Sequence, residues 1–167
     1  MKSIKLIFPI IALAILLLSN TIADTGNSLD ARLNTFKYEC KQLIKPARYE
    51  GSRITYYAAS KEVQKKTVEA YFLLNTEYKL AFSGKECSTK TSVKIYDSAD
   101  EKKRTLLKDV KGIQGKNVMI SSKDLSEVFA KKVSKEERLK VVYIEYTIGA
   151  NVSKNEAAVL VIGYTDI

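Results

Sequence analysis

The chain has 167 residues, of which 28 are Lys or Arg and 19 are Asp or Glu, so its formal net charge is +9 at pH 7. A positive charge of this size favours encounters with anionic partners but does not determine the fold. The sequence contains no histidine, which excludes the usual general base, the usual imidazole metal ligand and the Ser-His and Cys-His nucleophile pairs.

The first residues have the three-part pattern of a secretory signal peptide. Lys2 and Lys5 give a positive start, an apolar run follows over residues 6–18, and small residues stand at Thr21 and Ala23. A transmembrane anchor needs about 20 apolar residues, and the polar residues that follow the run make it too short. We therefore expect cleavage after Ala23 and export to the periplasm or the extracellular space.

The mature chain predicted in this way, residues 24–167, has 144 residues, which suits a single domain. Removing residues 1–23 takes away two lysines and no acid, so the net charge falls to +7. No later apolar stretch approaches spanning length, and we expect no membrane span after signal cleavage.

The two cysteines, Cys40 and Cys87, are an even number in a chain expected to enter an oxidising compartment. They have no CxxC spacing and no histidine partner, so a structural disulfide is favoured over a metal site or a reactive thiol. The disulfide would close a loop of about 48 residues, for which chain entropy gives a stabilisation of about 4 kcal/mol.

Residues 28–45 are predicted to form an amphipathic helix, which Ser28 can cap with its hydroxyl. Its apolar residues recur at spacings of three and four, as one stripe of a helix does: Leu29, Leu33, Phe36, Cys40, Leu43 and Ile44. Pro46 ends the helix, since the residue before a proline is pushed out of helical geometry. The polar face carries both signs of charge, so we expect the stripe to pack on the protein's own core and not on a membrane.

After Gly51 the apolar pattern alternates with the period of β-strands. Eight segments are predicted to be strands: 53–60, 67–74, 77–83, 92–97, 104–110, 116–121, 139–149 and 157–164. The second segment would place Val68, Ala70, Phe72 and Leu74 on one face. Between the sixth and seventh, residues 122–132 have apolar residues at helical spacing, which predicts one short helix near 123–131.

The last two strands are apolar on both faces for much of their length, which is typical of central strands covered on both sides. The helix at 28–45 is the available cover, and the two cysteines would fasten it to the sheet. We predict a mainly β fold of about eight mostly antiparallel strands, in a sandwich or a barrel, with this helix packed on it.

The connection between the strands at 92–97 and 104–110 concentrates charge: Asp97, Asp100 and Glu101, then Lys102, Lys103 and Arg104. A calcium loop would need more oxygen ligands and a glycine at the bend. A polyanion site would combine the three bases with others, such as Lys61, Lys65 and Lys66, or Lys131, Lys132 and Lys135. We interpret the segment as a solvated hairpin loop, and keep Lys102, Lys103 and Arg104 as possible anion-binding residues.

The sequence offers little catalytic chemistry, since no GxSxG, GxxxxGK or GxGxxG motif is present. A hydrolase built on two carboxylates stays open, with Glu69 and Glu145 as the acids that lie within predicted strands. The ten tyrosines could form a sugar-binding platform, but core and cross-strand packing is the simpler explanation. We expect no catalytic residue, no metal, no cofactor and no nucleic-acid partner.

The chain resembles small, uncharacterised exported bacterial β-sandwich proteins. The resemblance rests on YEGSRIT at 49–55, EYKLAFSG at 77–84, the SVKIYD…KKRTLL segment at 92–107 and the apolar last strand ending in GY at 163–164. It implies a β-rich exported domain and assigns no functional residue.

These observations favour an exported, non-catalytic binding module whose partner is a protein or an anionic component of the envelope. The first alternative is a β-barrel carrier of a small apolar ligand lined by Tyr and Phe. The second is the carboxylate-based hydrolase.

Overall fold

The computed structural model describes residues 28–167. The expected signal peptide, residues 1–23, lies outside the described residues. The chain divides into two compact units, 1–32 and 33–167. In the first unit, the described residues form the start of helix α2 (Leu29–Leu43), where the amide of Ala31 donates to the Ser28 hydroxyl at 3.2 Å. This contact confirms Ser28 as the helix cap.

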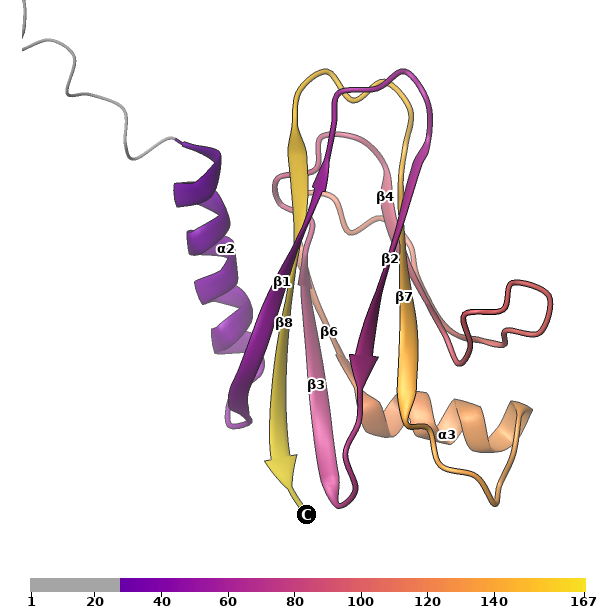
Figure 1. Cartoon of the computed structure of the whole chain (residues 1–167). Helices are drawn as coiled ribbons and strands as arrows, with labels where there is room; N and C mark the ends of the chain where they lie inside the picture. Colours follow the sequence, from indigo (N-terminus) through magenta and orange to yellow (C-terminus); the bar gives the residue numbers. More distant parts are fainter. Residues whose placement is uncertain (1–27) are drawn as a thin grey trace, which may run out of the picture. The chain divides into compact units, whose positions relative to one another are not determined.

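The second unit is a sandwich of two four-stranded antiparallel sheets (Figure 1). The first, called the β8 sheet, has the order β1-β8-β3-β6, and the second, called the β7 sheet, has the order β2-β7-β4-β5. The strands are β1 (Arg48–Tyr57), β2 (Gln64–Tyr71), β3 (Thr76–Ser83), β4 (Thr91–Tyr96), β5 (Leu106–Val110), β6 (Asn117–Ser121), β7 (Val141–Ile148) and β8 (Glu156–Asp166). The predicted mainly β fold of eight antiparallel strands is therefore confirmed.

The fold is a sandwich and not the closed barrel that the carrier hypothesis assumes. The space between the sheets is filled by alternate residues of the central strands, which are fully buried: Leu80 and Phe82 of β3, Val93 and Ile95 of β4, Val142, Ile144, Tyr146 and Ile148 of β7, and Ala158 and Leu160 of β8. Removal of this apolar surface from water is the main stabilising contribution to the fold.

Strand β8 is buried on its other face as well, as its apolar sequence predicts. Ala157, Val159 and Val161 alternate with the core residues and are buried outside the central cluster. Ile44, in the turn after helix α2, is buried and lies against Gly163 of β8, so it supplies part of the cover. A Cβ at Gly163 would lie 2.6 Å from Ile44 Cδ1 and 3.0 Å from the Arg48 carbonyl oxygen, so any larger residue would force Ile44 to shift.

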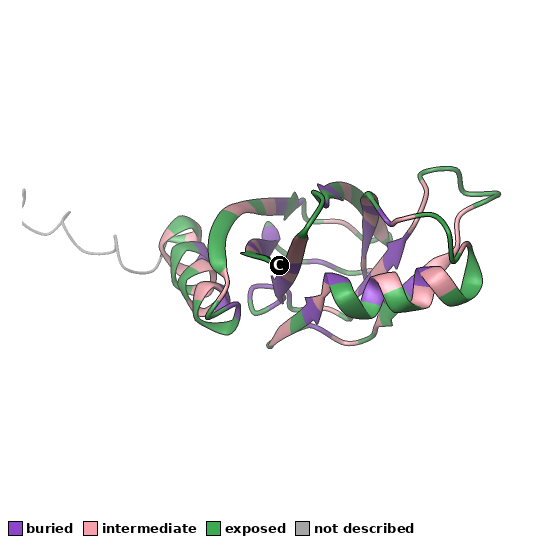
Figure 2. Ribbon diagram, turned by 90° about the horizontal axis from the view of Figure 1, so that it is seen from below, coloured by how far each residue is buried: buried purple, intermediate pink, exposed green. Residues whose placement is uncertain are grey.

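The second helix, α3 (Ser122–Lys132), matches the short helix predicted near 123–131. Ser121 caps it by accepting a hydrogen bond from the Asp124 amide at 3.1 Å. Leu125 and Phe129 are buried in the core, so α3 has a buried and an exposed side (Figure 2). No helix among residues 28–167 has the length and apolar character needed to span a bilayer.

Several strand boundaries differ from the sequence prediction, most of all in β1 and β2. Strand β1 begins at Arg48, five residues earlier than expected. Strand β2 ends at Tyr71, so the expected inward position of Leu74 is wrong: Leu73 and Leu74 lie in the β2–β3 turn with 67% and 73% of their surface exposed. The turn is enforced at Asn75, whose φ of 55° is a conformation that Asn tolerates.

Candidate functional site

The outer face of the β7 sheet presents polar and aromatic side chains to solvent, unlike the apolar outer face of β8. In β7, Tyr143, Glu145 and Thr147 alternate with core residues and therefore point outward. Strand register sets two rows across the sheet. Tyr143 pairs with Glu69 of β2 and Tyr96 of β4, while Glu145 pairs with Thr67 of β2 and Lys94 of β4.

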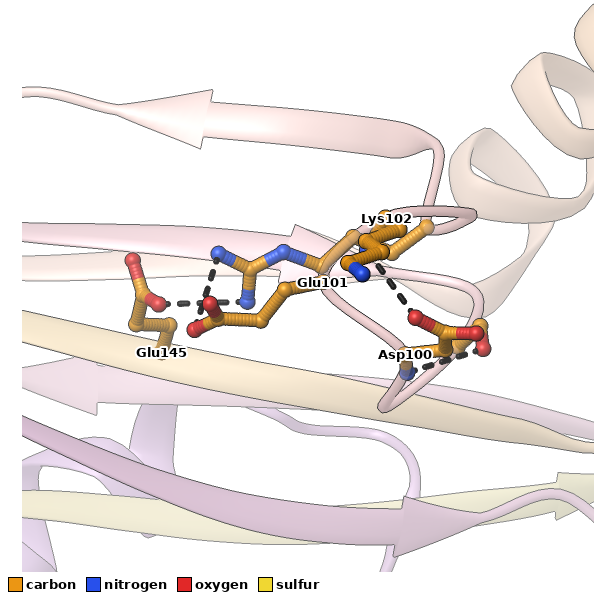
Figure 3. A network of polar contacts seen from close by, with 6 residues as sticks. Asp100, Glu101, Lys102 and Glu145 are labelled. Carbon is orange, nitrogen blue, oxygen red and sulfur yellow. Dashed lines mark hydrogen bonds and ion pairs between the residues drawn. The ribbon is translucent and has the colours of Figure 1, made fainter.

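The charged loop between β4 and β5, residues 97–104, is attached to this face by the side chain of Arg104. The Arg104 Nη1 atom is 3.2 Å from Glu145 Oε2, and its Nη2 atom is 3.8 Å from Glu101 Oε1. The guanidinium also stacks 3.9 Å above the centre of the Tyr96 ring. In Figure 3, Glu101 and Glu145 point toward each other, with dashed lines to this guanidinium.

The loop is held in shape by its own acids, which accept backbone hydrogen bonds. The Asp97 carboxylate accepts from the Thr105 amide at 2.6 Å, and the Asp100 carboxylate accepts from the Lys102 amide at 3.0 Å (Figure 3). The segment is thus the hairpin connection that the sequence predicts, but Arg104 anchors it to the sheet.

The structure separates the three predicted anion-binding residues. Arg104 has only 17% of its side chain exposed and is paired with Glu145, whereas Lys102 and Lys103 are exposed on the loop. Of the other bases considered, Lys132 donates to the Leu106 carbonyl at 3.0 Å. Anion binding by Lys102, Lys103 and Arg104 stays a prediction.

An open pocket of about 620 Å³ lies on the β2–β7 side of this loop. Six of its lining residues carry charge or a phenol, and they come from three strands and the loop: Arg53, Glu69, Tyr71, Glu101, Arg104 and Tyr143. Thr67 lies beside them. We call this site the β2–β7 pocket.

One wall of the pocket is formed by neighbouring side chains of β2. The Tyr71 hydroxyl donates a hydrogen bond to Glu69. This hydrogen bond, followed by the charge of Glu69, raises the pKa of Tyr71, while the nearby Arg53 acts in the opposite direction. Arg53 belongs to β1 of the other sheet, so the pocket spans the open edge of the sandwich.

The two side chains beneath Arg104, those of Tyr96 and Glu145, are less exposed than Glu69 and Tyr71 in this wall. Burial, and then the charge of Glu145, raises the pKa of Tyr96 beneath the Arg104 guanidinium. Glu145 itself is only 5% exposed and is not among the residues that line the pocket. The two acids of the hydrolase hypothesis thus lie on adjacent strands of one face, but Glu69 is exposed and Glu145 is covered by Arg104.

The predicted disulfide is not formed in the structure, where Cys40 and Cys87 are both buried free thiols. The Cys87 thiol donates to the Ala157 carbonyl at 3.7 Å. Burial raises the pKa of Cys40 to about 12 and that of Cys87 to about 11, so both are protonated at neutral pH. The segments that carry them contact each other, because Nζ of Lys85, two residues before Cys87, lies 2.7 Å from Oε2 of Glu39, which precedes Cys40.

Among the charged and phenolic lining residues, Arg53 was not singled out from the sequence, Glu101 was considered only as a calcium ligand, and Tyr71 and Tyr143 only among the ten tyrosines. Alternation could have grouped some of them, because Glu69 and Tyr71 stand two residues apart on one strand, as do Tyr143 and Glu145. No local signal could place Arg53 beside them, since it comes from the opposite sheet.

No protein-family model matches the sequence, and no match among curated proteins was found. Among solved structures, a chain of the Bacillus endospore appendages, a family of disulfide-linked pili, has a TM-score of 0.36 and 8% identity over 72% of this chain and 90% of that chain. A CBM4 structure has a TM-score of 0.36 and 12% identity over 71% and 78% of the two chains. A chain of infectious bursal disease virus, Gx strain, has a TM-score of 0.27 and 9% identity over 68% and 32%. At these TM-scores the similarities support no conclusion about function.

Proposed function

We propose that the protein is an exported, non-catalytic binding module and that the β2–β7 pocket is its ligand site. The observation that carries the proposal is the fixed position of Arg104, which is held by Glu145 and Tyr96. A side chain fixed in this way holds one wall of the pocket in place before a ligand arrives, which reduces the entropy lost on binding.

Strand pairing supports the same proposal for the opposite wall. Glu69 and Tyr71 are joined by a hydrogen bond and stand on a strand paired with β7 along its length. The pocket volume of about 620 Å³ falls in the range of small-ligand sites, about 300–1,000 Å³. Aromatic side chains and a few polar groups in fixed positions are features of such sites.

Export is proposed from the signal-peptide pattern of residues 1–23, and a Cys40–Cys87 disulfide is proposed with it. The contact between Glu39 and Lys85 supports this pairing, since it brings together the two segments that carry the cysteines. The disulfide would fasten α2 to the β3–β4 connection. The protein would act in the periplasm or the extracellular space.

A second candidate is binding to an anionic envelope component through exposed loop lysines. Lys102 and Lys103 are exposed next to the pocket, and the expected mature chain carries a net charge of +7. Binding of this kind weakens strongly with salt, because exposed charges are screened.

The test measures binding of the protein, as secreted by an expression host, to lipopolysaccharide, acidic-lipid vesicles, peptidoglycan and neutral polysaccharides at low and high salt. Tyr71→Ala removes an exposed side chain from the pocket, and Tyr38→Ala is the matched control, since the two tyrosines are 62% and 63% exposed. Loss of binding in the Tyr71 variant alone supports the pocket. Loss only in a Lys102→Glu, Lys103→Glu variant supports the anionic surface instead.

A further inference from the structure

The charges that line the β2–β7 pocket cancel each other. Arg53 and Arg104 contribute two positive charges, and Glu69 and Glu101 contribute two negative ones. An anion would meet the two carboxylates, and a cation would meet the two guanidiniums, so each would lose much of its attraction to repulsion of similar size. Glu145 lies 3.2 Å from the Arg104 guanidinium and adds one further negative charge, so the pocket has no excess of positive charge although the whole chain is basic. This near balance of charges favours an uncharged ligand.

The pocket contains groups that only accept hydrogen bonds and groups that only donate them. The ionised carboxylates of Glu69 and Glu101 only accept, and the guanidinium of Arg53 only donates. Thr67 and Tyr143 carry hydroxyl groups that do both. A ligand that satisfies such a mixed set carries many groups that both donate and accept, which is the property of a polyhydroxylated molecule.

Two phenol rings supply aromatic contact surface, beside the apolar side chains of Val68 and Ala99. Tyr71 is 62% exposed although its hydroxyl is fixed by Glu69, so its ring is held in place while facing solvent. Tyr143 is half-buried one strand away, directly opposite Glu69 in the register. The C–H face of a pyranose ring packs on an aromatic ring of this kind, while the hydroxyl groups at its edge reach the surrounding polar side chains.

We propose that the β2–β7 pocket binds a neutral saccharide, with the ring of Tyr71 as a stacking surface and Glu69 and Arg53 as hydrogen-bonding partners of its hydroxyl groups. This inference rests on the proposed function, because it names the ligand class of the same pocket. The pocket is open to solvent, so a longer chain can extend beyond it.

The experiment is affinity electrophoresis in native gels that contain neutral polysaccharides (starch, β-glucan, xylan, mannan or galactan), followed by titration calorimetry with the matching hexasaccharide. Acidic polygalacturonate and its hexamer are the charged counterparts. We expect retardation by at least one neutral polysaccharide, with an affinity that changes less than about twofold between low and high salt, because no net charge is neutralised.

Substitutions test whether the saccharide binds in the β2–β7 pocket. Tyr71→Ala is expected to weaken the affinity about tenfold, since a stacked aromatic contact is lost. Tyr38→Ala leaves it unchanged. Glu69→Gln keeps the shape of the side chain but changes its acceptors, and is also expected to weaken neutral saccharide binding several-fold.

The outcomes separate the ligand class from the site. If no neutral polysaccharide retards the protein, the inference is overturned. If only polygalacturonate binds, in a salt-dependent manner and with loss in Tyr71→Ala, the ligand class is wrong but the pocket stands. If binding survives Tyr71→Ala and Glu69→Gln unchanged, the proposed pocket itself is rejected, together with the inference.

Discussion

Replacing Arg104 with Met tests whether the charged loop is anchored to the sheet. The change removes the guanidinium but keeps an apolar stem over the Tyr96 ring, and it leaves the Glu145 carboxylate, which is 6% exposed, without its cation. At 3.2 Å the two charges attract by about 5 kcal/mol with an effective dielectric constant of about 20, before desolvation is subtracted.

Removing one partner of a buried ion pair costs about 3–5 kcal/mol, because the other charge stays buried. Arg104 keeps 17% of its surface exposed, so water can partly replace it and the lower end of this range applies. We expect Arg104→Met to lower the free energy of unfolding by about 3 kcal/mol. For a urea slope of about 2 kcal/mol per molar, the midpoint falls by about 1.5 M.

The assay is urea unfolding at neutral pH for Arg104→Met, Glu145→Gln and the double variant. A coupling energy of about 2 kcal/mol is expected from this cycle, since the residues contact each other directly. The matched control is Arg48→Met, because Arg48 and Asp166 form a pair at 3.4 Å with 72% and 68% of their side chains exposed. Exposed pairs contribute about 0–1 kcal/mol. Equal losses in Arg104→Met and Arg48→Met, or a coupling energy near zero, would refute the anchoring.

Three further predictions concern the core and the buried thiols. Gly163→Ala should lower the free energy of unfolding by about 1–3 kcal/mol in urea, because the added Cβ would crowd Ile44. The control is Gly51→Ala, whose Cβ would have nothing within 4 Å and should lower it less. Equal losses in the two variants would contradict the close packing at Gly163. Tyr146→Phe should be neutral or stabilising by up to about 1 kcal/mol, since the buried hydroxyl has no hydrogen-bond partner among the described residues, and a large loss would show a missed partner. With Cys40 and Cys87 reduced, the free energy of unfolding should fall as the pH rises above 9.0, the ordinary thiol pKa of the unfolded chain. It should keep falling until the pH reaches the pKa values of the folded protein, about 12 for Cys40 and about 11 for Cys87. The slope is up to about 1.4 kcal/mol per pH unit for each thiol. Unfolding at stepwise higher pH checks this, and identical profiles for reduced and oxidised protein would contradict it.

Local patterns were sufficient to predict most elements of this fold. The apolar stripe that contains Leu33 and Cys40 predicts α2, and the alternation along β2 and β3 predicts strands, because each pattern is set by the period of its own backbone. The error at Leu74 has a local cause as well: an apolar residue continues the alternation, but the Asn75 turn ends the strand first.

The pocket could not be predicted in the same way, because its members come together through strand register and sheet order. Glu69 reaches Tyr143 only if β2 pairs with β7, and Arg53 reaches both only if β1 and β2 lie at the same edge of the sandwich. The sequence gives neither pairing, since alternation fixes which face a residue takes but not which strand lies beside it.

The outer faces of the two sheets are covered in different ways. Strand β8 carries Ala157, Val159 and Val161 outward, and such a face needs an apolar cover, part of which is Ile44 in the turn after α2. Strand β7 carries Tyr143 and Glu145 outward, and its cover is a charged loop attached through ion pairs. An apolar cover excludes water and leaves no site, whereas a polar cover attached at a few points leaves space beside it. The acidic and basic residues of the loop therefore act as its attachment to the sheet, and the β2–β7 pocket is the space that this attachment leaves open.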